Sequence, residues 1–202
     1  MAKRAATEPV VTGLTRQRLL EVAERLLLDA GYDNVSVRAI NAAAGANPAA
    51  VHYHFGSKDA LVTTLLEERL APVWQEELHR LEQRGRGGWV PSVAELADVV
   101  LTPLAELAAD PVGRLRLHLL ARVVLSGKRL EWTSRWFSLA PWIDLLRLAR
   151  PDLSEQQAAH RWALAFQLLL LHFGSPFGGA EHRPGVPVGS LHAFVVAGLD
   201  AP

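Results

Sequence analysis

The chain contains no cysteine. Disulfide bonds, thiolate zinc sites and a cysteine nucleophile are therefore excluded, and a reducing compartment is compatible with this composition. No run of the sequence approaches the roughly 18 uncharged apolar residues that a membrane-spanning helix needs. The basic residues near the start are not followed by the apolar segment of a signal peptide. We therefore expect a cytoplasmic protein without membrane contact.

The chain also lacks net charge, because 21 Lys and Arg residues balance 21 Asp and Glu residues. The molecule as a whole therefore offers no general attraction to a polyanion. Half of the residues are hydrophobic and 21% are charged, which is typical of a packed globular protein. We find no alternating β-branched run that requires a sheet, and we expect an all-α fold.

Helical periodicity and capping signals cover most of the sequence. The first helix is expected from Leu19 to Ala30, with Thr12 or Thr15 as its cap and Gly31 at its end. Three further helices are expected near the start, at 37–44 after the cap Ser36, at 48–54 after the cap Asn47 with Pro48 in first position, and at 58–84 after the cap Ser57. The later helices are expected at 93–109 after a Ser92/Glu95 capping box, at 111–126 after the cap Asp110, and at 155–173 after a Ser154/Gln157 capping box. Between them a segment at 130–150 is expected with a kink or break at Pro141, and a short last helix at 190–199. The glycine- and proline-rich stretch 174–189 between the last two helices is expected to be mobile.

The helices near residues 40 and 50 are separated by a Gly-Ala-Asn turn, which is the spacing of a helix-turn-helix. We expect a flexible basic tail at 1–14, a helix-turn-helix DNA-binding domain at 15–60, and a second helical domain at 61–202.

A helix at 48–54 would pack Val51 against Ile40 and would leave Ala49, Ala50, His52, Tyr53 and part of His54 for a partner. Small side chains allow a close approach to DNA, and an imidazole or phenol can donate to a phosphate. His52 and His54 cannot chelate one metal ion, because side chains two residues apart on a helix point about 200° apart. A structural role for His54, in the domain core or against the next helix, stays open.

The run from Thr15 to Leu61 resembles the DNA-binding domain of the tetracycline-repressor (TetR) family, above all in AGYDNVSVRAI and VHYHFGSKDAL. The resemblance implies an all-helical homodimer that binds a palindromic DNA operator with its N-terminal domain and a small-molecule effector with its C-terminal domain. The family's DNA-contacting positions fall here on Ser36, Val37, Arg38, Asn47, Pro48, Ala49, Ala50, His52, Tyr53, His54 and Lys58. Pro48 stands where the family often has lysine and His52 where it often has tyrosine, so an operator sequence is not carried over from relatives.

Four aromatic residues cluster after Leu130, and they could line an apolar effector pocket, with a polar anchor on the preceding helix. The pocket candidates are His118, Arg122, Trp132, Trp136, Phe137 and Trp142. Ordinary core or dimer contacts are the alternative for these side chains. Nothing in the sequence selects the effector beyond a hydrophobic or amphipathic character.

The helix at 155–173 becomes apolar almost all round at LLLLHF and needs cover on two sides, from its own core and from a partner. The resemblance also assigns the last two helices to dimerisation. The interface candidates are Trp162, Phe166, Leu169 and Phe173.

The sequence therefore predicts a ligand-responsive transcriptional regulator, most simply a repressor, that needs no cofactor or metal and is not an enzyme. The main rival is a helical carrier or enzyme that uses a tryptophan-lined cavity. No nucleophile, phosphate-loop or zinc-protease motif favours the enzyme. An architectural DNA binder without an effector is weaker, because the neutral charge gives little non-specific affinity.

Overall fold

The computed structural model describes residues 8–127, 132–174 and 186–202. These residues are helical with short connections and contain no strand, so the predicted all-α class is confirmed. The chain divides into two compact units, one ending at Leu65 and the other beginning at Leu66. Each unit is described by itself below.

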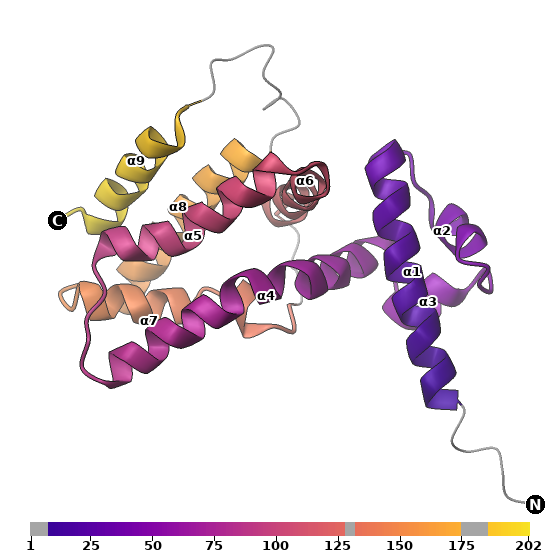
Figure 1. The fold of residues 1–202 in the computed structure, drawn as a ribbon, viewed down its shortest axis with the longest axis horizontal. Helices are drawn as coiled ribbons and strands as arrows, with labels where there is room; N and C mark the ends of the chain where they lie inside the picture. Colours follow the sequence, from indigo (N-terminus) through magenta and orange to yellow (C-terminus); the bar gives the residue numbers. More distant parts are fainter. Residues whose placement is uncertain (1–7, 128–131, 175–185) are drawn as a thin grey trace, which may run out of the picture. The chain divides into compact units, whose positions relative to one another are not determined.

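The first unit, hereafter unit 1, shows three helices and the beginning of a fourth in its described residues 8–65 (Figure 1). These are α1 (Glu8–Ala30), α2 (Val37–Ala43), α3 (Ala50–Phe55) and the first turns of α4 (Lys58–Arg86). Leu19, Leu27, Ile40, Val51 and Leu65 are fully buried and form its core. Ser36 caps α2 as predicted, because its hydroxyl accepts from the backbone N–H of Ala39 at 3.1 Å.

The first helix begins earlier than the sequence analysis expects. α1 starts at Glu8 and runs through Thr12 and Thr15, so neither threonine is its cap and residues 8–14 are not a tail. Pro9 is the signal that was missed, because proline suits the first turn of a helix, where its lack of an N–H costs nothing.

The described residues of the second unit, hereafter unit 2, form the rest of α4 and five more α-helices, with the short 3-10 helix η1 (Arg135–Phe137) before α7. They are α5 (Val93–Ala109), α6 (Pro111–Leu125), α7 (Ala140–Ala149), α8 (Glu155–Phe173) and α9 (Val188–Asp200). The predicted capping boxes at Ser92 and Ser154 and the Asp110 cap are all present.

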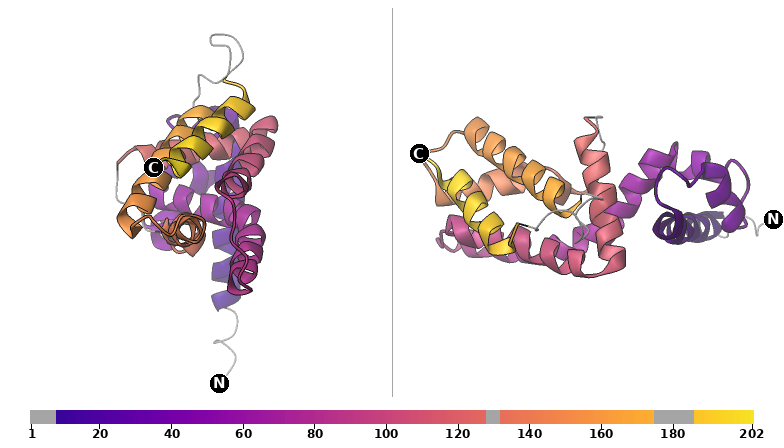
Figure 2. Two further views of the ribbon diagram at one scale, coloured as in Figure 1. Left: turned by 90° about the vertical axis from the view of Figure 1, so that its left-hand side faces the viewer. Right: turned by 90° about the horizontal axis from the view of Figure 1, so that it is seen from above.

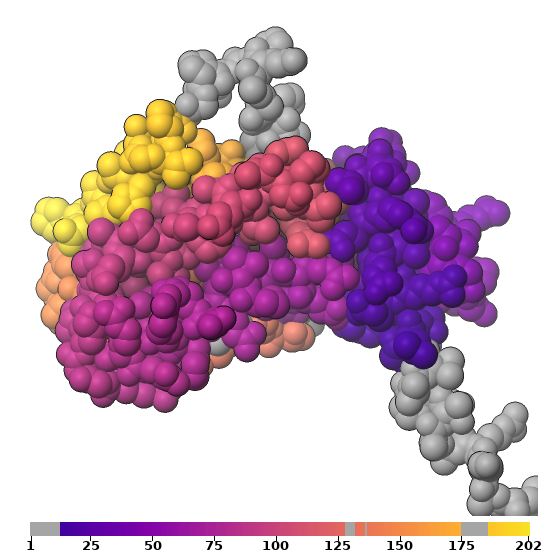
Figure 3. Space-filling model, viewed as in Figure 1, coloured from indigo at the N-terminus to yellow at the C-terminus, as the bar shows by residue number. Residues whose placement is uncertain are grey.

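Helices α5, α6, α7 and α9 pack around α8 (Figure 2). Side chains of α5 and α9 meet closely on one face of this unit (Figure 3). The core contains Leu96, Leu117, Leu146, Trp162 and Leu169, each with no exposed surface. Among the described residues, no helix has both the length and the apolar content of a membrane span.

The break expected at Pro141 within 130–150 is present, because α7 begins at Ala140 with Pro141 in its first turn, where proline fits a helix start. The described residues 132–139 before it form the short helix η1 and no α-helix, so the part of the expected helix before the break is not formed there. The predicted loop at 174–189 falls mostly on residues 175–185, outside the described residues, and α9 already begins at Val188.

Gly113 allows α6 to turn closely against the end of α5. A Cβ at this position would lie 2.1 Å from the carbonyl oxygen of Leu107 and 2.8 Å from its carbonyl carbon. Both are backbone atoms that cannot rotate away, so the turn between the two helices requires glycine here.

Candidate nucleic-acid interface and cavity

A buried asparagine joins the two helices of the helix-turn-helix. Asn41 on α2 is 1% exposed, and its amide donates to the carbonyl of Pro48 at 2.5 Å. Its side-chain oxygen accepts from the backbone N–H of Val51 at 3.1 Å. One side chain thus satisfies a backbone acceptor before α3 and a backbone donor inside it, which holds α3 at a defined place against α2.

The outer side of α3 differs from the expected one at a single residue. Ala49, His52 and Tyr53 are exposed, but Ala50 is only 7% exposed and faces the core of unit 1. The reason is that α3 begins at Ala50, two residues later than predicted, with Ala49 as its cap. Asn47 still stabilises this start, because its side chain accepts from the N–H of Ala49 at 2.9 Å.

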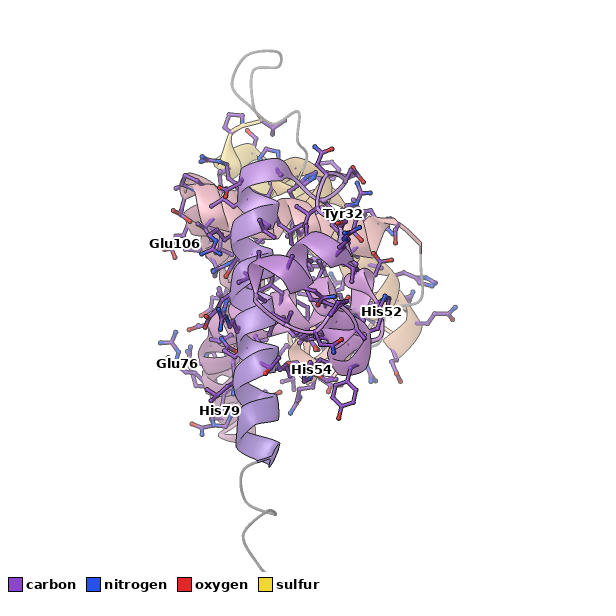
Figure 4. All side chains as sticks on the ribbon, turned by 90° about the vertical axis from the view of Figure 1, so that its right-hand side faces the viewer. Tyr32, His52, His54, Glu76, His79 and Glu106 are labelled. Carbon is purple, nitrogen blue, oxygen red and sulfur yellow. The ribbon has the colours of Figure 1, made fainter. Side chains whose placement is uncertain are left out.

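The imidazole of His52 has a defined orientation. Its Nδ1 lies 3.0 Å from the carbonyl oxygen of Gly56, the residue that ends α3. Because a carbonyl oxygen can only accept, Nδ1 is the donor, and Nε2 of the neutral ring is then an acceptor. Figure 4 shows His52 and His54 leaving α3 in different directions, as expected for residues two apart on a helix.

An open groove of about 580 Å³ lies between α1 and the helix-turn-helix. Tyr53 and His54 line it, with their rings in edge contact at 5.0 Å, and Tyr53 is 79% exposed. Arg18 of α1 lines the opposite side and is exposed. Arg18 was not among the predicted site residues, because only the packing of α1 against α2 brings it to the turn.

Lys58 has partners within unit 1. Its ammonium donates to the carbonyl of Tyr32 and lies 3.8 Å from the centre of the tyrosine ring. The hydroxyl of Tyr32 donates to Asp59. These contacts connect the first turn of α4 to the turn after α1, so Lys58 has a structural role beside its predicted phosphate contact.

The other predicted DNA-contacting residues differ in accessibility. Arg38, Asn47 and Pro48 are exposed, whereas Val37 is half-buried. Ser36 is exposed, but its hydroxyl is engaged as the cap of α2. Arg38 is therefore the cation among them with the most accessible position.

Unit 2 encloses an apolar cavity of about 260 Å³ between α4, α5, α6, α7, α8 and the segment 132–139. Three of the six predicted pocket residues line it: Trp132, Phe137 and Trp142. The side chain of Trp136 is outside the described residues. Trp74 of α4 also lines the cavity, and no pattern near residue 74 in the sequence indicates this.

His118 and Arg122 are not among the residues that line this cavity. Nδ1 of His118 lies 2.9 Å from the carbonyl oxygen of Gly174 and donates to it, which ties α6 to the end of α8. Arg122 is exposed. The prediction that His118 and Arg122 offer a polar anchor in this pocket is therefore wrong, because the side of α6 that faces the cavity carries Leu120 and Val124.

The predicted interface residues lie mainly inside the protomer. Trp162 and Leu169 have no exposed surface, and Phe166 lines the cavity and stacks on Trp162 at 5.3 Å. Phe173 is half-buried against the same core. A partner can contact only accessible side chains, so the prediction that Trp162 and Leu169 lie in the dimer interface is wrong.

The accessible apolar side chains of α8 and α9 are different ones. The most exposed are Leu164, Leu171 and Phe194, with 67%, 59% and 69% of their surface exposed, and Val188 at the start of α9 is 43% exposed. Leu164 and Leu171 are seven residues apart, so they lie on one face of α8. The two helices pack against each other, which places these side chains on neighbouring elements.

Glu67 connects α4 to a wall of the cavity. Glu67 is 8% exposed, and its carboxylate accepts from the backbone N–H groups of Thr133 at 2.6 Å and Ser134 at 2.7 Å. It also accepts from the hydroxyl of Thr133 at 2.8 Å. Trp132 and Phe137, which flank this segment, line the cavity. We call these three hydrogen bonds the Glu67 clamp.

No three metal-ligating side chains come together among the residues that the structure describes. The arrangement of unit 1 offers exposed donors around a short helix, and unit 2 offers an apolar cavity.

The family model described as bacterial regulatory proteins, tetR family, matches residues 19–65, which cover most of unit 1. The HTH-type transcriptional repressor AcnR of Corynebacterium glutamicum is 33% identical over 109 residues, which are 50% of this chain and 54% of that protein. AcnR of Corynebacterium efficiens is 37% identical over 57 residues, 28% of this chain and 30% of that protein. The chain thus spans about half, or less, of the length of these curated relatives.

Two solved structures share the fold over nearly the whole chain. NalD, the secondary repressor of the MexAB-OprM multidrug efflux pump in Pseudomonas aeruginosa, has a TM-score of 0.58 at 23% identity and covers 92% of this chain and 97% of its own. The fatty acid degradation regulator FadR from Bacillus halodurans has a TM-score of 0.55 at 16% identity and covers 98% and 99%. At these identities the similarity is one of fold.

Proposed function

Because this chain is a member of the tetR family of bacterial regulatory proteins through its residues 19–65, we propose that it is a transcriptional repressor that binds a palindromic DNA operator as a homodimer. A small molecule in the cavity of unit 2 releases it from the DNA. The observation that carries the proposal is α3, which Asn41 holds against α2 while its exposed side offers His52 and Tyr53. The name of the relative AcnR, a transcriptional repressor, supports the sign of regulation.

In this proposal α3 enters the major groove, where hydrogen-bonding groups on base edges identify the sequence. The backbone at Pro48 and Ala49 approaches the DNA closely, since both residues are exposed and neither has a long side chain. Arg38, Arg18 and Lys58 contact phosphates, which fix the position of the protein on the duplex. Asn47, Tyr53 and His54 lie around the same groove and add polar contacts.

His52 is the residue that we expect to read a base. With Nδ1 donating to Gly56, its neutral Nε2 accepts from an exocyclic amine of adenine or cytosine. Selection of bound duplexes from a random pool should yield a palindrome, and His52→Ala should lose the preference at one position of each half-site. We expect about a fivefold loss of discrimination there, since one net hydrogen bond is worth about 1 kcal/mol.

The matched control is His79→Ala, because His79 is an exposed histidine of α4 in unit 2. It should leave both the selected sequence and the affinity unchanged. If His52→Ala lowers binding equally on all sequences, then His52 contacts the backbone and reads no base. If the wild-type protein selects no sequence at all, the proposed function is wrong.

The homodimer is proposed to form through α8 and α9. A two-fold symmetric contact uses the same patch on both copies, and the exposed Leu164, Leu171 and Phe194 supply an apolar one. Such a dimer sets the separation of two α3 helices, which have to reach half-sites about 34–36 Å apart, or a multiple of this.

Leu164→Glu is expected to convert the dimer into monomers in sedimentation velocity, because two carboxylates would be buried without partners at the two-fold contact. A charge at Phe166 would not test this, since that ring packs on Trp142 and Trp162 inside the protomer. Leu148→Glu on α7, where the leucine is 43% exposed, is the matched control and should stay dimeric. A dimeric Leu164→Glu protein would place the interface elsewhere.

The rival proposal, a carrier or enzyme that uses the cavity, requires nothing from unit 1. The two can be separated by the same selection experiment, because only a regulator enriches a DNA sequence. The cavity is common to both and does not favour either.

A further inference from the structure

The cavity of unit 2 is apolar almost throughout. Its described lining consists of aliphatic and aromatic side chains together with Ser138 and Gln167, and none of these lining residues carries a charge. A buried carboxylate, phosphate or ammonium group needs a charged or hydrogen-bonding partner to offset the loss of its hydration. The lining therefore disfavours charged ligands and accepts neutral ones.

The polar group that stands out is the indole of Trp74. Its Nε1 is buried and has no acceptor among the described residues. Trp162 in the same core shows the usual situation, because its Nε1 donates to the carbonyl of Trp142 at 2.8 Å. A buried N–H without a partner is costly, and a ligand that supplies an acceptor removes this cost.

The shape of the ligand is indicated by the aromatic walls. Trp132 and Phe137 stack at 4.7 Å with an angle of 18° between their planes. Trp142 and Phe166 meet edge to face at 5.5 Å on another side. Aromatic rings contact such walls in stacked or edge-on arrangements, which favours a flat aromatic ligand over a long flexible chain.

We propose that this cavity binds a small, uncharged aromatic molecule with a hydrogen-bond acceptor, such as a ketone or amide oxygen, which accepts from Nε1 of Trp74 once this half-buried ring turns toward the space that it lines. The volume of about 260 Å³ is at the small end of ligand pockets, which suits one or two fused rings. The role of this molecule as the releasing effector rests on the proposed function, whereas its binding does not.

The test uses the neutral naphthyl ketone prodan, whose fluorescence reports an apolar environment and hydrogen bonding to its ketone. Prodan should bind the wild-type chain in the absence of DNA. Trp74→Phe keeps an aromatic ring and removes the N–H, and it should raise the Kd for prodan about five- to tenfold. The analogue without the ketone, dimethylaminonaphthalene, should bind both proteins equally.

Two further arms make the result decisive. The naphthoate in which a carboxylate replaces the ketone should bind at least about 100-fold more weakly than prodan. Ala163→Phe, which fills the cavity from α8, should abolish binding of both neutral compounds. Trp89→Phe is the matched control, since Trp89 stacks under Arg84 at 3.5 Å and is not among the residues that line the cavity; it should bind prodan as the wild type does.

If Trp74→Phe weakens the binding of prodan and of the ketone-free analogue equally, the proposed hydrogen bond to Nε1 is wrong. If the naphthoate binds as tightly as prodan, the proposed restriction to neutral ligands is wrong. Neither result touches DNA binding. A protein that selects no DNA sequence but binds prodan as described would instead reject the proposed function and keep this site.

Discussion

Asn41→Leu is expected to abolish DNA binding on every sequence while unit 2 stays folded. Leucine has the same number of side-chain heavy atoms and the same branching as asparagine, but it leaves the carbonyl of Pro48 and the N–H of Val51 without their partner. Each unsatisfied buried group costs about 1–3 kcal/mol, so with two such groups we expect unit 1 to lose about 2–6 kcal/mol. A unit of this size has a total stability of only about 3–10 kcal/mol.

The measurement is thermal unfolding of the full chain, followed by circular dichroism, together with DNA binding at low temperature. Two transitions are expected in Asn41→Leu, with the one from unit 1 moved to lower temperature. Asn34→Leu is the control, because Asn34 is exposed and donates only to the carbonyl of Ala30 at the end of α1. Wild-type DNA affinity and unchanged melting in Asn41→Leu would show that the bridge does not hold α3.

Asn41 also shows where a sequence pattern stops being informative. Val37, Ile40 and Ala44 follow the spacing of a buried helical stripe, and Asn41 lies at a position of the same stripe. A polar residue there predicts a buried hydrogen bond but not its partner. The partner atoms belong to the backbone before and within α3, and only the folded turn brings them within reach.

Helix limits were predicted best where a cap and its partner lie within one turn. The Ser154 capping box predicts a helix at 155–173, and α8 spans Glu155–Phe173. The start of α3 was misplaced by two residues, because the side chain of Asn47 bonds to Ala49 in a turn before the helix rather than in its first turn. This small shift moves Ala50 from the predicted outer face to the core.

The cavity illustrates the same limit at longer range. Trp132, Phe137 and Trp142 are near one another in the sequence, and their clustering was visible in it. Trp74 is more than 50 residues away on α4 and joins them only through packing. Conversely, the apolar run of α8 indicated burial, but the sequence could not tell which of its sides would meet the core of the same protomer and which would stay accessible.

The Glu67 clamp provides the second large effect that we expect. Thr63, Glu67 and Trp74 lie on one side of α4, so a carboxylate is buried beside the cavity wall that it holds. Hydrogen bonds to a charged group contribute about 1.5–3 kcal/mol each, and the desolvation of the carboxylate offsets part of this. Glu67→Ala should therefore lower the free energy of unfolding of unit 2 by about 2–3 kcal/mol, as measured by urea denaturation.

Glu67→Gln separates geometry from charge, because its amide oxygen can still accept from the N–H groups of Thr133 and Ser134. It should lose less than half as much stability as Glu67→Ala. Glu76→Ala, at an exposed position of α4, should change the free energy of unfolding by less than about 0.5 kcal/mol. Equal losses in Glu67→Ala and Glu76→Ala would mean that the clamp contributes nothing.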